Sequence, residues 1–248
     1  MIKNLFEEIG KYFNMLWITF SKPEKMSVFG ARTTDEIFSI GMSSIPIVAI
    51  MSFFMGSVVT MQTGHNMDSP LLPAYTLGFV SRSSIVLEFS PTIMSLILAG
   101  KVGSNIASEI GTMRTTEQID ALEIMGVNSL TFLVLPKMIG AMIFFPILII
   151  ISIGLGLLGG AFAVYITGFA TLETYIFGLR AFFAPYDLFY ALTKSVFFAF
   201  IITSVSSFYG YYTKGGSIDV GRSSTQAVVT SSIVILIVNL ILTKIMLF

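Results

Sequence analysis

The residue best placed to do chemistry in this sequence is a carboxylate inside an apolar stretch. Glu88 lies within the mostly apolar residues 71–108, whose other charged residues are Arg82 and Lys101, and Arg82 precedes it by more than one helical turn. A charge inside a membrane helix is costly and usually faces a cavity, water or a partner. Pro91 should disturb the helix here, so Glu88 could line a cavity or hold an ion. The alternative is a structural ion pair with a neighbouring helix, for which Lys194 is a candidate.

Groups that would carry out catalysis or bind a metal are scarce. The sequence has no cysteine and one histidine, His65, which excludes thiolate chemistry and a histidine-rich metal site. Motifs of zinc peptidases, serine hydrolases and Walker-type nucleotide sites are missing. Residues 214–221, KGGSIDVG, resemble a phosphate loop only loosely, so we interpret them as a tight turn. We expect no catalytic residue, no metal and no cofactor in this chain.

Residues 112–126 form a short polar insert between apolar stretches, and their pattern predicts a helix. Thr115 and Gln118 fit a capping box, Thr116 could also act as the cap, and Gly126 suits the end of the helix. A helix this short is marginal alone in water, so we expect it to pack on something.

The faces of this insert indicate its partner. Ile119, Leu122 and Met125 share one face, and the acidic residues Glu117, Asp120 and Glu123 point elsewhere, with Glu117 in the first turn. We favour a docking helix for a cytoplasmic subunit, and a solvated loop is the alternative.

The composition indicates that lipid surrounds most of the chain. Of 248 residues, 54% are hydrophobic and 11% are charged, and the mean hydropathy is +0.87. A soluble domain would carry about a quarter charged residues. The formal net charge is zero, which argues against a nucleic-acid partner. The stretches long enough to span a bilayer are 37–61, 71–108, 131–166, 188–212 and 227–248.

The N-terminal residues 1–30 have a different pattern. Apolar residues recur at helical spacing from Ile2 to Trp17, and charged residues fill the other side. This predicts a helix lying in the membrane interface, with Trp17 and Tyr12 at headgroup depth. An ordinary soluble amphipathic helix is the alternative. We find no cleavable signal peptide in these residues.

Basic residues set the expected orientation. They gather before the first span, around residues 109–130 and in the connection after the fourth span, whereas the other two connections carry only Arg180. The positive-inside rule then places the N-terminus and residues 109–130 in the cytoplasm. With five spans the C-terminus faces the opposite side, and Lys244 near it could snorkel.

Small residues form stripes at spacings of four. Such stripes let two helix backbones approach closely in a membrane, either within one chain or between subunits, and the sequence leaves both open. One stripe is Ala99, Gly103, Ala107 and Gly111; the second is Gly100, Ser104 and Ser108; Gly156 and Gly160 offer a similar face.

Three stretches resemble the MlaE-type (MlaE/YrbE) permease family, the membrane subunit of lipid-transporting ABC systems that work with MCE-domain proteins. They are EFSP from Glu88, AGKVGSNIASEIGTMRTTEQIDALEIMGV from Ala99, and KGGSIDVGRSSTQAVVTSS from Lys214. The family typically shows ELGP, a run of the type AGRxG…AELGTMxxTEQIDALExMG, and GVGRATTxAVVxS. The match follows nearly the whole chain in order and spacing. Departures such as Lys101 in place of arginine, and Asn105, bear on local packing.

The resemblance implies an all-α integral membrane protein with one permease domain, residues 1–248, in the bacterial inner membrane. It implies a homodimer with five spans per chain, a cytoplasmic ABC ATPase that binds ATP and Mg, and a periplasmic MCE-domain partner. The implied substrate is phospholipid, held in an outward-facing cavity at the dimer centre. The ATPase would push residues 112–126, a coupling helix, and so collapse the cavity.

The expected sites follow from this resemblance and from position along the spans. The lipid cavity should be lined by Met55, Val58, Val59, Gln62, Tyr75, Leu77, Ser81 and Glu88, of which only Glu88 lies on a matched motif. The ATPase should dock on Arg114, Glu117, Gln118, Asp120 and Glu123. The rival interpretations are a secondary transporter or channel that uses Glu88, an intramembrane lipid enzyme, and a non-transporting scaffold for an ATPase.

Overall fold

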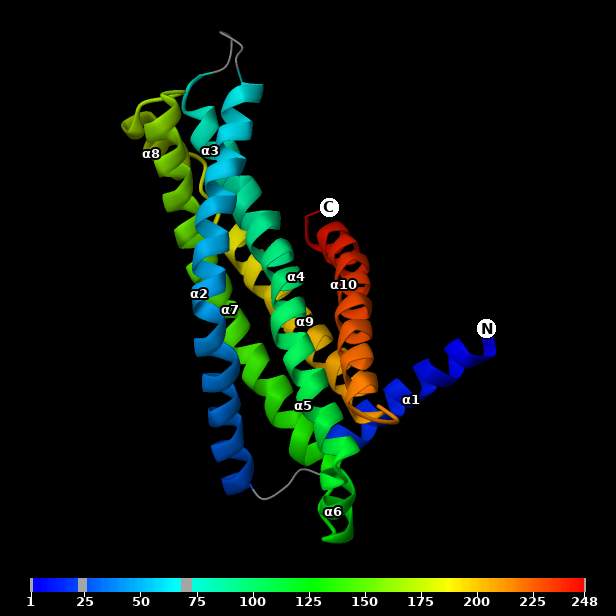
Figure 1. The fold of residues 1–248 in the computed structure, drawn as a ribbon. Helices are drawn as coiled ribbons and strands as arrows, with labels where there is room; N and C mark the ends of the chain where they lie inside the picture. The colour runs from blue at the N-terminus through cyan, green and yellow to red at the C-terminus, as the bar shows by residue number, and fades with distance from the viewer. Residues whose placement is uncertain (1, 22–25, 68–72, 248) are drawn as a thin grey trace. The chain divides into compact units, whose positions relative to one another are not determined.

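The computed structural model describes residues 2–21, 26–67 and 73–247, and all the regular structure in these ranges is helical (Figure 1). The chain divides into two compact units. Unit 1 comprises Met1–Ser43, Leu96–Phe144 and Phe197–Ile241. Unit 2 comprises Ser44–Ser95, Phe145–Val196 and Leu242–Phe248.

Among the residues that the structure describes, five helical stretches are long and apolar enough to cross a membrane, which confirms the all-α membrane class. Four are single helices, and the second is composite. The single helices are α2 (Met26–Asn66), α7 (Ser129–Thr167), α9 (Pro185–Tyr211) and α10 (Ser217–Leu247). The composite span contains α3 (Thr76–Ser84), η1 (Ile85–Ile93), α4 (Met94–Leu98), η2 (Ala99–Gly103) and α5 (Ser104–Thr115). The expected start of this span at Leu71 lies outside the described residues.

The composite span contains two π-helical segments. Pro91 lies in η1, where its missing N–H removes a backbone hydrogen bond, so the expected disturbance takes the form of a widened helix rather than a break. η2 follows at the glycine-containing run AGKVG. Both segments keep their residues in helical conformation, so the backbone continues to Thr115.

The start of the last span and one additional helix are among the differences from the expected elements. α10 begins at Ser217, ten residues before the expected Ala227, because its first turns are polar and hydropathy alone does not detect them. Residues 217–221 of the expected tight turn at residues 214–221 are therefore helical. The short helix α8 (Leu172–Arg180) was not expected; the side chain of Thr171 caps it by accepting a hydrogen bond from the Thr174 N–H at 3.2 Å.

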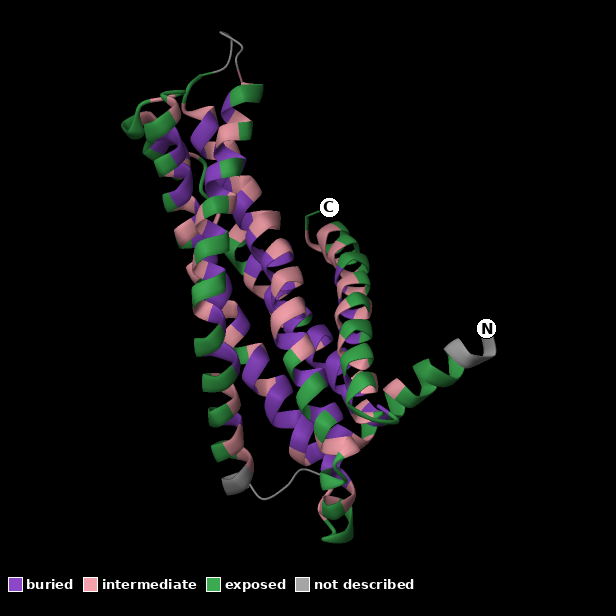
Figure 2. Cartoon of the chain, in the orientation of Figure 1, coloured by how far each residue is buried: buried purple, intermediate pink, exposed green. Residues whose placement is uncertain are grey.

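Helix α1 (Ile2–Ser21) contacts the rest of unit 1 through one of its faces only. The Tyr12 hydroxyl hydrogen-bonds Ser204 of α9 at 2.8 Å, and burial raises the pKa of this phenol. Phe13 and Trp17 are exposed by 63% and 76%. Much of α1 is coloured as exposed in Figure 2. An exposed Trp17 suits an interfacial helix, whereas Tyr12 turns its hydroxyl into the protein.

Small residues account for close helix approaches inside each unit. In unit 2 a Cβ placed on Gly56 of α2 would lie 1.9 Å from the carbonyl oxygen of Gly156 in α7, so both backbones touch. In unit 1 a Cβ on Gly103 would lie 2.8 Å from Ser206 Oγ of α9. The stripe from Ala99 to Gly111 is buried against the same chain. A Cβ on Gly100, in the second stripe, would instead meet open space.

Candidate functional site

Glu88 stands at the centre of a polar cluster in unit 2. Its Oε1 accepts a hydrogen bond from Lys194 Nζ at 2.7 Å, and longer ones from the hydroxyls of Tyr190 and Thr243 at 3.4 Å. Its Oε2 accepts from Thr92 Oγ1 at 3.0 Å. Glu88 therefore forms the ion pair that the sequence left as an alternative, and Lys194 is its partner.

The two partners differ in exposure. The Lys194 side chain is 0% exposed, and the Glu88 side chain is 43% exposed. Lys194 Nζ also lies 4.3 Å from the centre of the Tyr190 ring. A carboxylate already neutralised by a buried ammonium is a poor site for a further cation, so the geometry disfavours an ion site at Glu88.

Arg82 does not pair with Glu88 but holds the end of α8. Its guanidinium donates to the carbonyl oxygens of Leu179 at 2.8 Å, Ala181 at 2.9 Å and Phe182 at 3.2 Å. Leu179 lies in the last turn of α8, and Ala181 and Phe182 follow it, at the end of the helix where backbone acceptors lack intrahelical partners and a cation is favourable. Arg82, only 3% exposed, therefore has a structural role in unit 2.

The eight residues predicted to line a lipid cavity are not gathered around one cavity in the described part of the chain. Met55 lines a small hollow of about 10 Å³ with residues of η1 and α7. Val58 and Gln62 are exposed, whereas Val59, Leu77 and Ser81 are buried within unit 2. Tyr75 is half-buried against the ring of Phe177, and Glu88 belongs to the cluster above. Their common cavity stays a prediction.

The predicted coupling helix is shorter than expected. α5 continues to Thr115, Thr116 and Glu117 make a corner, and α6 occupies only Gln118–Ile124. The N-cap of α6 is Glu117, in a left-handed conformation with φ 60° and without a side-chain cap. Placing Glu117 in the first helical turn was therefore wrong.

The predicted capping box was also wrong. The hydroxyls of Thr115 and Thr116 both donate to the carbonyl oxygen of Thr112, at 3.1 and 2.8 Å. Gln118 does not reach back to the backbone but donates from Nε2 to Thr116 Oγ1 at 3.0 Å. The reason is that α5 runs directly into the corner, where the Thr112 carbonyl in its last turns accepts both hydroxyls in addition to the Thr116 N–H.

The predicted end of α6 is confirmed. Gly126 has a positive φ of 78°, which favours glycine. Its N–H donates to the Glu123 carbonyl, and the Val127 N–H donates to the Leu122 carbonyl, both at 3.0 Å. This hydrogen-bond pair is the Schellman arrangement that ends helices at glycine.

Two of the predicted docking acids are engaged within unit 1. Asp120 Oδ1 accepts from Arg114 Nη1 at 2.6 Å. Glu123 Oε1 accepts from the hydroxyls of Ser129 and Tyr211, each at 2.9 Å. These bonds tie α6 to the end of α5, the start of α7 and the end of α9.

The outer surface of α6 and its C-terminal turn, which we name the α6 tip, consists of Glu117, Gln118, Ile124 and Met125, all exposed. Ile124 is 87% exposed and Met125 is 68% exposed, whereas Ile119 is buried. Ile119, Leu122 and Met125 were expected to share one helix face, but α6 ends at Ile124, so Met125 follows the helix and is exposed while Ile119 is buried. The sequence analysis did not name Ile124 as a candidate docking residue. The available signal was that an apolar residue lies away from the face that contains Ile119.

Lys137 of α7, whose side chain is buried, is the centre of a second ion cluster, which the sequence did not single out. Its Nζ lies 2.6 Å from Glu36 Oε1 of α2 and 2.8 Å from Glu109 Oε2 of α5, and its side chain is only 4% exposed. The cluster joins three helices of unit 1. A lysine near the start of an apolar span was the available signal, but the spacing could not reveal its partners.

Comparisons with known proteins match most of the chain. The family model described as Permease MlaE covers residues 33–245. A probable ABC transporter permease protein of Rickettsia bellii is 35% identical over 97% of this chain and 92% of its own length. Proteins with the same description from Synechocystis sp., 35% identical over 87% and 81%, and Porphyra purpurea, 32% identical over 92% and 87%, are also similar. The chain therefore belongs to the MlaE permease family of ABC transporter permeases.

Proposed function

We propose that this chain is the permease subunit of an ABC-type phospholipid transport system. It moves lipid between the bacterial inner membrane and a periplasmic MCE-domain protein, and a separate cytoplasmic ATPase binds ATP and Mg and drives the cycle. The α6 tip carries this proposal, because it presents apolar side chains to solvent at the end of a helix fastened to three spans (Figure 1).

The α6 tip has the properties of a docking surface. Large apolar side chains such as Ile124 and Met125 are rarely left so exposed on a short helix unless a partner covers them. Glu117 and Gln118 beside them offer a polar rim. The ion pair of Arg114 with Asp120 holds α6 at the end of α5, so a push on the tip reaches α5 directly.

The transported lipid would lie between two copies of the chain. Side chains on the outer surface of α2 are apolar and exposed, including Ile50, Phe54 and Val58, and they suit either acyl chains or a second copy. The half-exposed carboxylate of Glu88, with Lys194 behind it, offers a polar contact for a headgroup. Leu77 and Ser81 enter such a cavity only if α3 moves. The N-terminus lies in the cytoplasm and the C-terminus in the periplasm in this proposal.

The docking step is tested by co-purification of the ATPase with the permease. The double variant Ile124→Asp/Met125→Asp should lose the ATPase, because two charges replace the apolar contacts of the α6 tip. Ile218→Asp, at the exposed start of α10, is the matched control and should keep the ATPase. Glu117→Lys should weaken binding less. Asp120 is unsuitable, since its change also frees Arg114. An intact complex from the double variant would reject α6 docking.

The transport step is tested with the complete complex in proteoliposomes. A fluorescent phospholipid should pass to a soluble MCE-domain acceptor only with ATP. The double variant Glu88→Gln/Lys194→Met, which removes the carboxylate without leaving a buried ammonium unpaired, should slow this transfer. Transfer that is absent while the ATPase stays bound would favour the scaffold interpretation. ATP-independent ion flux that requires Glu88 would favour a channel.

A further inference from the structure

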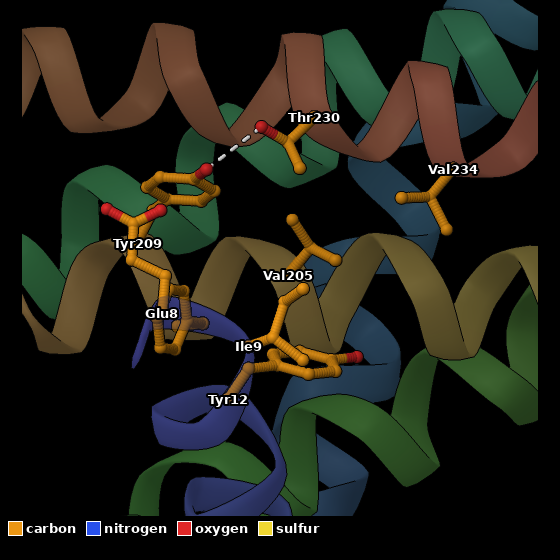
Figure 3. A pocket seen from close by; sticks show the side chains of 8 residues that line it. Glu8, Ile9, Tyr12, Val205, Tyr209, Thr230 and Val234 are labelled. Carbon is orange, nitrogen blue, oxygen red and sulfur yellow. Dashed lines mark hydrogen bonds between the residues drawn. The ribbon is translucent and has the colours of Figure 1, made fainter. Parts of the chain in front are cut away.

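Unit 1 contains a groove enclosed by α1, α9 and α10 that the transport proposal does not use. It consists of two hollows, one of about 220 Å³ and one of about 590 Å³. Glu8, Phe208 and Tyr209 line both hollows, so the two share a wall. We call the pair the interfacial groove; Figure 3 shows its smaller hollow.

The smaller hollow is apolar. Ile9 of α1, Val205 of α9 and Val234 of α10 line it from three sides. The tyrosine hydroxyls at its edge already have partners: Tyr209 bonds Thr230 at 3.0 Å, and Tyr12 bonds Ser204 outside the hollow. The space therefore offers hydrocarbon surface and suits part of an acyl chain.

The larger hollow is charged. Arg222 and Asp219 in it are paired with each other at 3.4 Å. The ion pairs found among the described residues do not include Lys11, Lys214 or Glu8, which also line this hollow. Two ammonium groups and one carboxylate therefore face the space without a charged partner. Such a set matches a ligand that carries both a phosphate and a cationic group.

The two ends of the interfacial groove follow the polarity of a membrane surface. The charged end lies where α9 ends at Tyr211 and α10 begins at Ser217, while the apolar end lies further along both spans, at Val205 and Val234. Exposed aromatic side chains of α1, such as Trp17, suit headgroup depth. A ligand in the groove would have its polar part at the end of the spans and its apolar part along them.

We propose that the interfacial groove binds one phospholipid in addition to the transported one. Lys11 and Lys214 bind its phosphate, Glu8 binds a head-group ammonium, and one acyl chain enters the apolar hollow. The lipid is therefore zwitterionic with a primary amine, of the phosphatidylethanolamine type, and it fixes α1 against α9 and α10. A protein helix is a poorer occupant, because a helix is about 10 Å across and the apolar hollow holds only about 220 Å³.

The head-group contacts are tested by native mass spectrometry of the full chain, purified in detergent and stripped of lipid. Phosphatidylethanolamine, phosphatidylglycerol and inorganic phosphate are added separately. We expect one tightly bound phosphatidylethanolamine per chain. Lys11→Gln/Lys214→Gln should weaken it about tenfold. Lys244→Gln, an exposed lysine at the other end of α10, should not. Glu8→Gln should abolish the preference over phosphatidylglycerol.

The acyl-chain contact is tested by filling the apolar hollow. Val234→Trp should weaken phosphatidylethanolamine as strongly as the lysine pair does, whereas Val229→Trp, exposed on the same helix, should leave binding unchanged. Each variant must keep the elution volume and melting temperature of the parent chain. The head-group variants and the acyl-chain variant test separate contacts, so one prediction can fail while the other holds.

Three results would overturn the proposal. The first is equal lipid binding by all variants. The second is inorganic phosphate binding that depends on the lysines while Val234→Trp has no effect on lipid, which would indicate a free phosphate site. The third is photo-crosslinking from position 234 that joins two copies of the chain instead of chain and lipid, which would indicate an interface between copies.

Discussion

Lys194 Nζ and Glu88 Oε1 lie 2.7 Å apart in an ion pair with one partner sealed from the surface and the other open to it. Lys194 is enclosed by unit 2, and 43% of the Glu88 side chain is accessible. If Glu88 loses its charge, the ammonium has no access to water. If Lys194 loses its charge, the carboxylate can still be solvated or meet a ligand. The two single substitutions should therefore lower the free energy of unfolding by different amounts.

Glu88→Gln should destabilise the protein more than Lys194→Met. Leaving a buried ammonium uncompensated costs about 3–5 kcal/mol, which lowers the apparent melting temperature in detergent by about 10 °C. Lys194→Met should cost less than half as much, because Glu88 is partly exposed. The double variant should recover most of the loss, and a double-mutant cycle measures the coupling. Equal costs for the two single variants would contradict this account.

Lys137→Met should loosen the junction of α2, α5 and α7. The change leaves Glu36 and Glu109, both bonded to Lys137 Nζ, facing each other without a cation. Because the side chains of Glu36 and Glu109 are 22% and 55% exposed and can be solvated, we expect a loss of only about 1–2 kcal/mol, observed as a lower melting temperature. Adding Glu36→Gln should restore part of it by removing the repulsion. A second change that lowers stability further would show that the carboxylates do not repel each other.

Glu117→Gly should stabilise the corner between α5 and α6. Glu117 has φ 60°, a conformation that costs most residues roughly 1–2 kcal/mol and glycine nothing. Greater freedom of glycine in the unfolded chain offsets part of the gain, so we expect about 0.5–1 kcal/mol. Glu117→Val should be destabilising by at least as much. Thermal unfolding of the three proteins in one detergent gives the order, and a glycine variant below the parent chain would reject strain at this position.

Gly56→Ala should disrupt the contact of α2 with α7. The added Cβ would lie 1.9 Å from a backbone oxygen of Gly156, and backbone cannot move aside as a side chain can. Gly154→Ala, on α7 with open space around it, is the matched control and should be neutral or slightly stabilising. Gly103→Ala should be intermediate, since Ser206 Oγ can rotate away from the added Cβ. Melting temperatures that do not separate Gly56→Ala from Gly154→Ala would contradict this ranking.

The spans could be predicted from sequence because apolar length alone identifies them. Hydropathy placed the third span at 131–166, and α7 occupies Ser129–Thr167. Hydropathy did not predict the start of α10 at Ser217, because the first turns of this helix are polar. Helical backbone hydrogen bonds form without apolar side chains, so hydropathy does not detect them. It also missed α8, which is short and begins at the cap of Thr171.

The site could be predicted only where residues close in sequence decide it. Gly126 ends α6 as expected because its own backbone conformation is sufficient. The capping box failed because Thr115 and Thr116 had a competing acceptor in the preceding helix. The partner of Glu88 was named only as one of two alternatives, since Lys194 lies 106 residues away and no local rule joins them.

The wide turn at Ala99–Gly103 lies one helix before α6 in unit 1. π-helical hydrogen bonding places more residues in each turn than an α-helix does. If this turn changed to α-helical bonding, the segment Ala99–Gly103 would lengthen slightly and α5 would rotate about its own axis. No residue would be inserted and no loop would need to refold. A local change in helical pitch would then rotate the end of the span. The ion pair of Arg114 with Asp120 would transmit this rotation to α6.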